Sequence, residues 1–144
     1  MNEQSYKNHR RYVPGYHFVL LGILLVYLVG SVYFFAKCFI HNTAHLLPAL
    51  VLLSSVSFSL IYWYMRQFAI RAQDRAIRAE ENLRHFALTG KLLDAKLRMG
   101  QIIALRFAPD DEFIGLAAKA AAENLSSDAI KKSIKNWRAD NHRA

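Results

Sequence analysis

The sequence is poor in cysteine, with Cys38 as its one thiol, and holds three prolines and six glycines in 144 residues. One cysteine cannot form an internal disulfide, so the fold does not depend on an oxidising compartment. Nucleotide-binding loops, nucleophile elbows and metalloprotease signatures are also missing. We therefore expect a protein that is not an enzyme, with no catalytic residue and no cofactor.

Charge is absent from two long stretches, residues 16–36 and 46–65, which contain no Asp, Glu, Lys or Arg. Each meets the length of about 20 apolar residues that crosses a bilayer. A single segment in lipid satisfies its own backbone hydrogen bonds only as a helix. The two stretches therefore predict a transmembrane helical hairpin.

The formal net charge is +8, and its distribution predicts the topology. Lys7, Arg10 and Arg11 precede the first stretch, Lys37 alone stands at its outer end, and every other Lys or Arg lies between Arg66 and Arg143. Basic residues that flank membrane spans stay on the cytoplasmic side. We therefore expect both termini in the cytoplasm, and we read the charge as lipid-directed, because no pattern for binding nucleic acid is present.

Small residues in the two spans predict close helix packing. Ser31 in the first span and Ser54, Ser55, Ser57 and Ser59 in the second can bond to a carbonyl one turn earlier or to the partner helix. The alternative is a pore lined by Ser55 and Ser59, which requires several copies in a ring, because two helices enclose no channel.

The connection between the spans has the spacing C-x2-H-x3-H, formed by Cys38, His41 and His45. These residue types could bind zinc or copper. The connection offers no carboxylate to orient the histidines, and we expect no metal there.

After the second span, alanine-rich sequence without Gly or Pro predicts that its helix continues to about Leu88, where Gly90 ends it. Ile70, Ile77, Leu83 and Phe86 follow a helical spacing. Three further helices are expected at 91–107, at 111–124 and after the capping residues 126–128, the last with Ile130, Ile134 and Trp137 on one face.

Six arginines flank the spans at membrane level, and we expect them to contact anionic lipid headgroups. They are Arg10, Arg11, Arg66, Arg71, Arg75 and Arg78.

Two groups in the tail have chemical potential. His85 lies one helical turn from Glu81 and could form an acid-base pair, although such spacing is more typical of a surface pair. Asp110, Asp111 and Glu112 could bind a cation, although acidic residues are also favoured at the start of a helix.

The tail also carries a family resemblance. Its segments DRAIRAEENLRHF, LTGKLLDAKL, QIIALRFAPDDEF and AIKKSIKNWRAD, between Asp74 and Asp140, resemble an uncharacterised bacterial family of small two-span membrane proteins, known as a domain of unknown function. The resemblance implies a bacterial inner membrane and assigns no activity.

Together these patterns predict an all-α protein with a cytoplasmic N-terminal segment (1–15), a two-span hairpin (16–66) and a cytoplasmic helical domain (67–144). We expect a non-catalytic inner-membrane scaffold or accessory subunit that associates with itself or with a membrane protein; the alternative is the homo-oligomeric channel. The predicted partner contacts are Phe107, Phe113, Ile130, Ile134 and Trp137.

Overall fold

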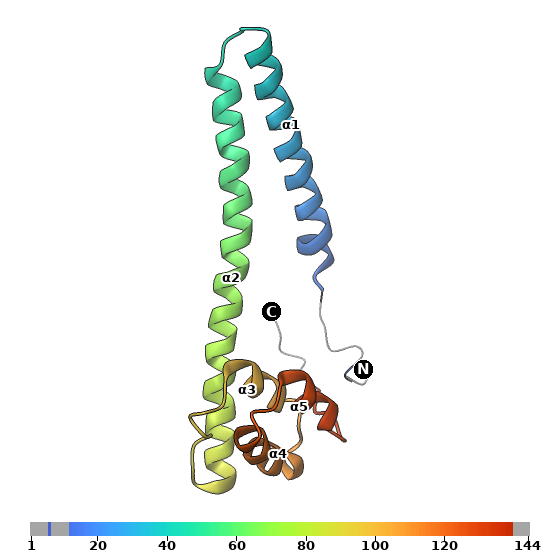
Figure 1. The fold of residues 1–144 in the computed structure, drawn as a ribbon, viewed down its shortest axis with the longest axis vertical. Helices are drawn as coiled ribbons and strands as arrows, with labels where there is room; N and C mark the ends of the chain where they lie inside the picture. Colours follow the sequence, from blue (N-terminus) through green and yellow to red (C-terminus); the bar gives the residue numbers. More distant parts are fainter. Residues whose placement is uncertain (1–5, 7–11, 140–144) are drawn as a thin grey trace. The chain divides into compact units, whose positions relative to one another are not determined.

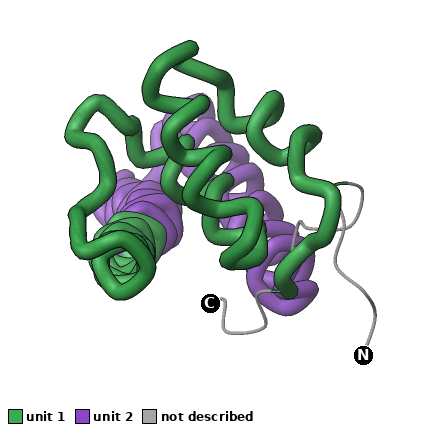
Figure 2. Tube along the Cα trace, turned by 90° about the horizontal axis from the view of Figure 1, so that it is seen from below, with its two compact units in different colours: residues 1–11, 69–144 green, residues 12–68 purple. Residues whose placement is uncertain are grey.

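The computed structural model describes residue 6 and residues 12–139, and every regular element in this part of the chain is a helix. This confirms the all-α prediction. The contacts divide the chain into two compact units (Figure 2), of which one comprises Tyr12–Phe68 and the other includes all described residues from Ala69 onward. We call them the N-terminal unit and the tail unit.

The N-terminal unit consists of a short π-helix, η1 (Gly15–Leu20), the helix α1 (Leu21–Ile40) and the first half of α2 (Leu46–Thr89) (Figure 1). Between α1 and α2 the chain turns at Asn42, which has a left-handed φ of 52°. The Thr43 N–H and hydroxyl both donate to the Cys38 carbonyl and close this turn.

Polar side chains join α1 to α2. The Ser31 and Ser55 hydroxyls lie 2.8 Å apart and both side chains are buried, while the Tyr27 hydroxyl lies 2.7 Å from that of Ser54. Each of these two serine hydroxyls also lies 2.8 Å from a carbonyl of its own helix, at Leu28 and Leu52, so one hydroxyl donates across to the other serine while the second donates to its carbonyl. Tyr16, at the start of this helical stretch, bonds to Tyr62, whereas Tyr27, later in the chain, pairs with the earlier residue Ser54 of α2. The two helices are therefore antiparallel. The predicted contact between helices is found for Ser31, Ser54 and Ser55, whereas Ser57 and Ser59 donate to carbonyls of their own helix.

Both η1 with α1 and α2 are long and apolar enough to cross a membrane. The structure contains no lipid, so the transmembrane hairpin stays a prediction. The end of α2 agrees with the sequence, since the helix stops at Thr89 and Gly90 adopts the expected left-handed φ of 72°. The Gly90 N–H donates to the Phe86 carbonyl at 2.7 Å.

The predicted helix at 91–107 is wrong over its first half, where the chain is irregular until α3 (Met99–Leu105). Side chains bind backbone N–H groups here: Asn82, 11 residues earlier, accepts from Leu93, and Asp94 accepts from Lys96. Gln101 likewise accepts from the Arg98 N–H at 2.7 Å and so caps α3. These side-chain acceptors, one of them distant in sequence, outweigh the helical periodicity of this segment.

The remaining helices are α4 (Asp110–Ala122) and α5 (Ser127–Ser133), and the Ser126 hydroxyl caps α5 by accepting from the Ala129 N–H. The prediction that α5 carries Ile134 and Trp137 is wrong, because Ile134 is extended, with φ −73° and ψ 122°. Beyond it, the Arg138 N–H donates to the Phe107 carbonyl at 2.8 Å. This bond secures the extended segment to the tail unit.

Gln101 is a polar residue inside the tail unit, only 2% exposed. Its amide donates to the Leu125 carbonyl at 2.8 Å while its oxygen caps α3. A buried amide with both ends bonded adds specificity without an unsatisfied group. Gln101 thereby ties the start of α3 to the loop between α4 and α5.

Candidate functional site

The five predicted partner contacts lie together, but inside the tail unit. Phe107, Phe113 and Ile130 are 0% exposed and Ile134 is 6% exposed. Trp137 is partly buried, with its ring centroid 4.9 Å from that of Phe107. The proposed partner contact is therefore corrected to a core role, because apolar periodicity marks a buried face without telling which surface buries it.

Arg84 attaches α2 to the start of α4. Its guanidinium bonds to Glu81 at 3.1 Å, to Asp110 at 2.6 Å and to the Ala108 carbonyl at 2.8 Å. The guanidinium carbon also lies 4.3 Å from the centre of the Phe113 ring. The Arg84 and Glu81 side chains are 12% and 9% exposed, so this pair forms largely out of water, where charge-assisted bonds are strongest, whereas Asp110 is 65% exposed.

Glu81 and His85 do not form the candidate acid-base pair, because Glu81 bonds Arg84 instead. The His85 Nδ1 lies 2.7 Å from the Lys91 carbonyl, to which it donates, and the Thr89 hydroxyl donates to the His85 carbonyl. Burial raises the pKa of Glu81 above 4.5, and the contact with Arg84 opposes this rise. Glu81 therefore pairs with Arg84, and His85 binds the backbone just beyond the end of α2.

The acidic triplet is divided among structural roles. All three side chains lie in the first turn of α4, as expected from the helix dipole. Asp110 pairs with Arg84, while the Glu112 carboxylate accepts from the backbone N–H groups of Lys135 at 2.9 Å and Asn136 at 3.0 Å. The Lys135 N–H is the main reason that the pKa of Glu112 lies below 4.5. Glu112 thus holds the segment after α5 against α4.

No group of three or more His, Cys, Asp or Glu side chains in the described part of the chain is placed to hold a metal ion. Cys38, His41 and His45 are not brought together, and the His45 ring lies 5.9 Å from that of Phe39. The loop therefore has a turn geometry and an aromatic contact in place of a ligand set.

Four of the six candidate lipid contacts lie on α2. Arg66 lies in the N-terminal unit, with its guanidinium carbon 5.9 Å from the Tyr16 ring centre, while Arg71, Arg75 and Arg78 are exposed in the tail unit. Arg10 and Arg11 lie outside the described residues.

The predicted pore residues differ in position. Ser55 is 1% exposed and bonded to Ser31 of the same chain, whereas Ser59 is partly exposed and donates to the Ser55 carbonyl. Ser55 therefore offers no free hydroxyl to a channel between copies. The channel stays a prediction that these contacts do not favour.

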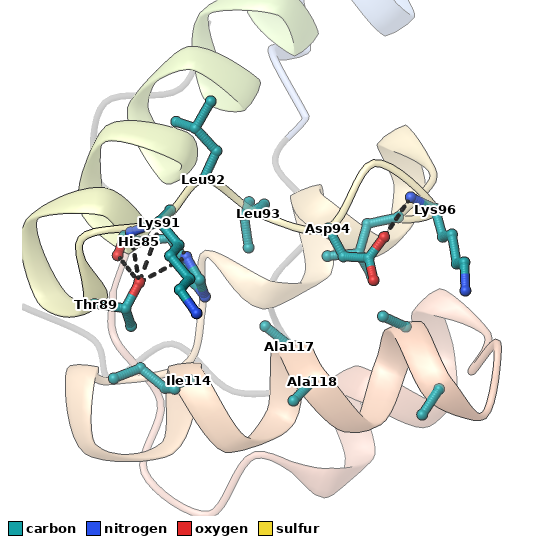
Figure 3. A pocket seen from close by; sticks show the side chains of 13 residues that line it. His85, Thr89, Lys91, Leu92, Leu93, Asp94, Lys96, Ile114, Ala117 and Ala118 are labelled. Atoms are coloured by element: carbon teal, nitrogen blue, oxygen red, sulfur yellow. Dashed lines mark hydrogen bonds between the residues drawn. The ribbon is translucent and has the colours of Figure 1, made fainter.

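The tail unit has an open apolar groove of ≈ 590 Å³ between the end of α2, the irregular segment and one side of α4 (Figure 3). Four alanines of α4 line it, together with Ile114 and Leu92, the latter 66% exposed. The alanines are Ala117, Ala118, Ala121 and Ala122. Small methyl groups leave the groove unfilled, and the exposed Lys91 and Lys96 also line it.

Sequence reasoning missed Arg84, Gln101 and the groove. Arg84 is one of many basic residues in the tail, and its partner Asp110 lies 26 residues away in sequence, so the pattern around Arg84 does not indicate the pair. Gln101 stands amid the apolar residues Met99, Ile102 and Ile103, and a lone amide in an apolar stretch is a signal of a buried bonded group.

We expect Arg84→Met to lower the free energy of unfolding of the tail unit by about 3 kcal/mol, because it leaves Glu81 buried without its cation. The raised pKa of Glu81 sets the sign. Its protonated form is favoured by folding, so the loss is larger at neutral pH and smaller as pH falls toward 4.5. Hydrogen exchange of amides in α3 to α5 measures it. Arg78→Met, at an exposed position, is the control, and equal losses in both variants contradict this role.

Glu112 predicts an acid-sensitive attachment. Its folded pKa is lowered, so the stabilisation is fully present above pH 4.5 and disappears as pH falls through the folded value. Hydrogen exchange should show the Lys135 and Asn136 amides protected at neutral pH and losing protection in acid. In Glu112→Gln the same two amides should be less protected at neutral pH and should show no further loss of protection in acid. Asp111→Asn should behave as the wild type. Persistence of the acid loss in Glu112→Gln would assign it to another group.

The family model of a family of unknown function, DUF6526, matches residues 1–144. No curated protein matches the chain, and no solved structure does.

Proposed function

Because the chain belongs to the DUF6526 family, for which no function is described, we propose a function from the geometry: a non-catalytic scaffold or accessory subunit of the bacterial inner membrane. The observation that carries the proposal is the open apolar groove on a folded tail unit. The same chain holds two apolar helices suited to anchoring that unit at a bilayer.

The anchoring is supported by the charge distribution. In the proposed topology both termini are cytoplasmic, since Lys and Arg gather before the first span and after the second. The proposed headgroup contacts after the second span are Arg66, Arg71, Arg75 and Arg78, whose charges attract anionic lipid over about a Debye length.

The groove takes one kind of occupant in this proposal, an apolar protein segment with carboxylates. Its floor of alanine methyls suits closely packed aliphatic side chains. Lys91 and Lys96 line it, and neither forms an ion pair among the described residues, so their charges are free to attract acidic side chains. The partner is thus a membrane protein with an acidic and apolar cytoplasmic segment.

Photo-crosslinking in native membranes tests the proposal. A photoreactive residue at Ala118, in the groove, should give one discrete adduct whose cross-linked peptide is apolar and acidic. The same group at the neighbouring Lys119, which does not line the groove, is the control. Reversal of both charges, Lys91→Glu with Lys96→Glu, should reduce the Ala118 adduct about tenfold. An adduct that is unaffected by the reversal, or equal at both positions, would overturn the proposed docking.

A further inference from the structure

The part of α2 in the tail unit has a second apolar face. One face packs within the unit through Ile77, Glu81 and Arg84. Six further residues recur at alternating intervals of three and four, the spacing that puts side chains on one side of a helix. We call them the outer stripe, and all are exposed: Ala69, Ala72, Ala76, Ala79, Leu83 and Phe86.

Helix propensity explains the alanines but not the two large residues at the end of the stripe. Leu83 is 68% exposed and Phe86 is 51% exposed. Both continue the phase set by the alanines, so the stripe has the seven-residue repeat of a coiled coil, with positions a at 69, 76 and 83 and positions d at 72, 79 and 86. Alanines at such positions let two helix backbones approach closely.

The charges beside the stripe identify the partner. Arg75 occupies position g and Glu80 occupies position e, both exposed and neither ion-paired within the described residues. In a parallel pair in register, position g of one helix lies beside position e, five residues later, of the other. Arg75 of each copy then meets Glu80 of the second copy, and symmetry forms this pair twice. An antiparallel pair sets g beside g and e beside e, which leaves the charges unmatched.

We propose that the outer stripe binds the outer stripe of a second copy as a short parallel coiled coil. The inference rests on the proposed function in one respect: two copies anchored in one membrane have α2 helices that leave it in the same direction. It also gives Arg75 a role besides lipid binding. Each dimer then presents two grooves.

Disulfide formation in native membranes tests the dimer. In a Cys38→Ser background, Ala76→Cys and Ala79→Cys should each give a covalent dimer under mild oxidation, since a parallel pair in register brings identical positions together all along the stripe, whereas an antiparallel pair does so only at its two-fold axis. Arg78→Cys, exposed on the flank of the helix, is the matched control and should stay monomeric. Equal dimer at all three positions, or an adduct whose mass is not two copies, would overturn the proposal.

Charge reversal supplies the second arm. Arg75→Glu and Glu80→Arg should each lower the dimer yield at position 79 about fivefold, and the double variant should restore it, because the swapped charges still match in parallel register. A double variant that stays defective overturns the pairing. If cross-linking at 79 fails while the Ala118 adduct persists, the dimer is wrong and the docking function stands. If the dimer forms and the Ala118 adduct is missing, the docking function alone fails.

Discussion

The continuity of α2, whose backbone hydrogen bonds run through 44 residues, is the constraint on which the rest of the chain depends. Its sequence has no glycine or proline between Pro48 and Gly90 that would interrupt the helix. One half of α2 packs against α1 through Ser55, and the other half supports the tail unit through Arg84. Residues of the same helix thus contribute to the packing of both units.

Strong local signals made α2 predictable. Its alanine-rich course and the left-handed Gly90 depend on neighbouring residues alone, as does the Ser126 cap of α5. The irregular segment at 91–98 could not be foreseen in this way. Leu93 and Leu97 keep a helical interval and are buried, yet the Leu93 N–H is taken by Asn82, 11 residues earlier in the chain. Periodicity identified the buried residues and misassigned the backbone that presents them.

The apolar residues of the tail unit show the same limit of prediction from sequence. Phe107 and Ile130 were recognised as apolar contacts, but sequence cannot say whether an apolar face meets its own chain or a partner. The unfilled groove arises from four alanines of α4, which read in sequence as ordinary helix formers. In the account proposed above, the large apolar residues build the core, and the small ones leave surfaces open for other chains.

A scan of single spin labels along α2, with the chain in lipid vesicles, tests whether one continuous helix leaves the bilayer and enters the tail. The account predicts an unbroken helical periodicity of collision rates from 46 to 89, with oxygen favoured up to about residue 65 and a water-soluble paramagnetic reagent favoured beyond it. Loss of the periodicity near residue 66 would show that the helix does not continue from the membrane into the tail. Preference for the water-soluble reagent at every position would show that α2 does not enter the bilayer.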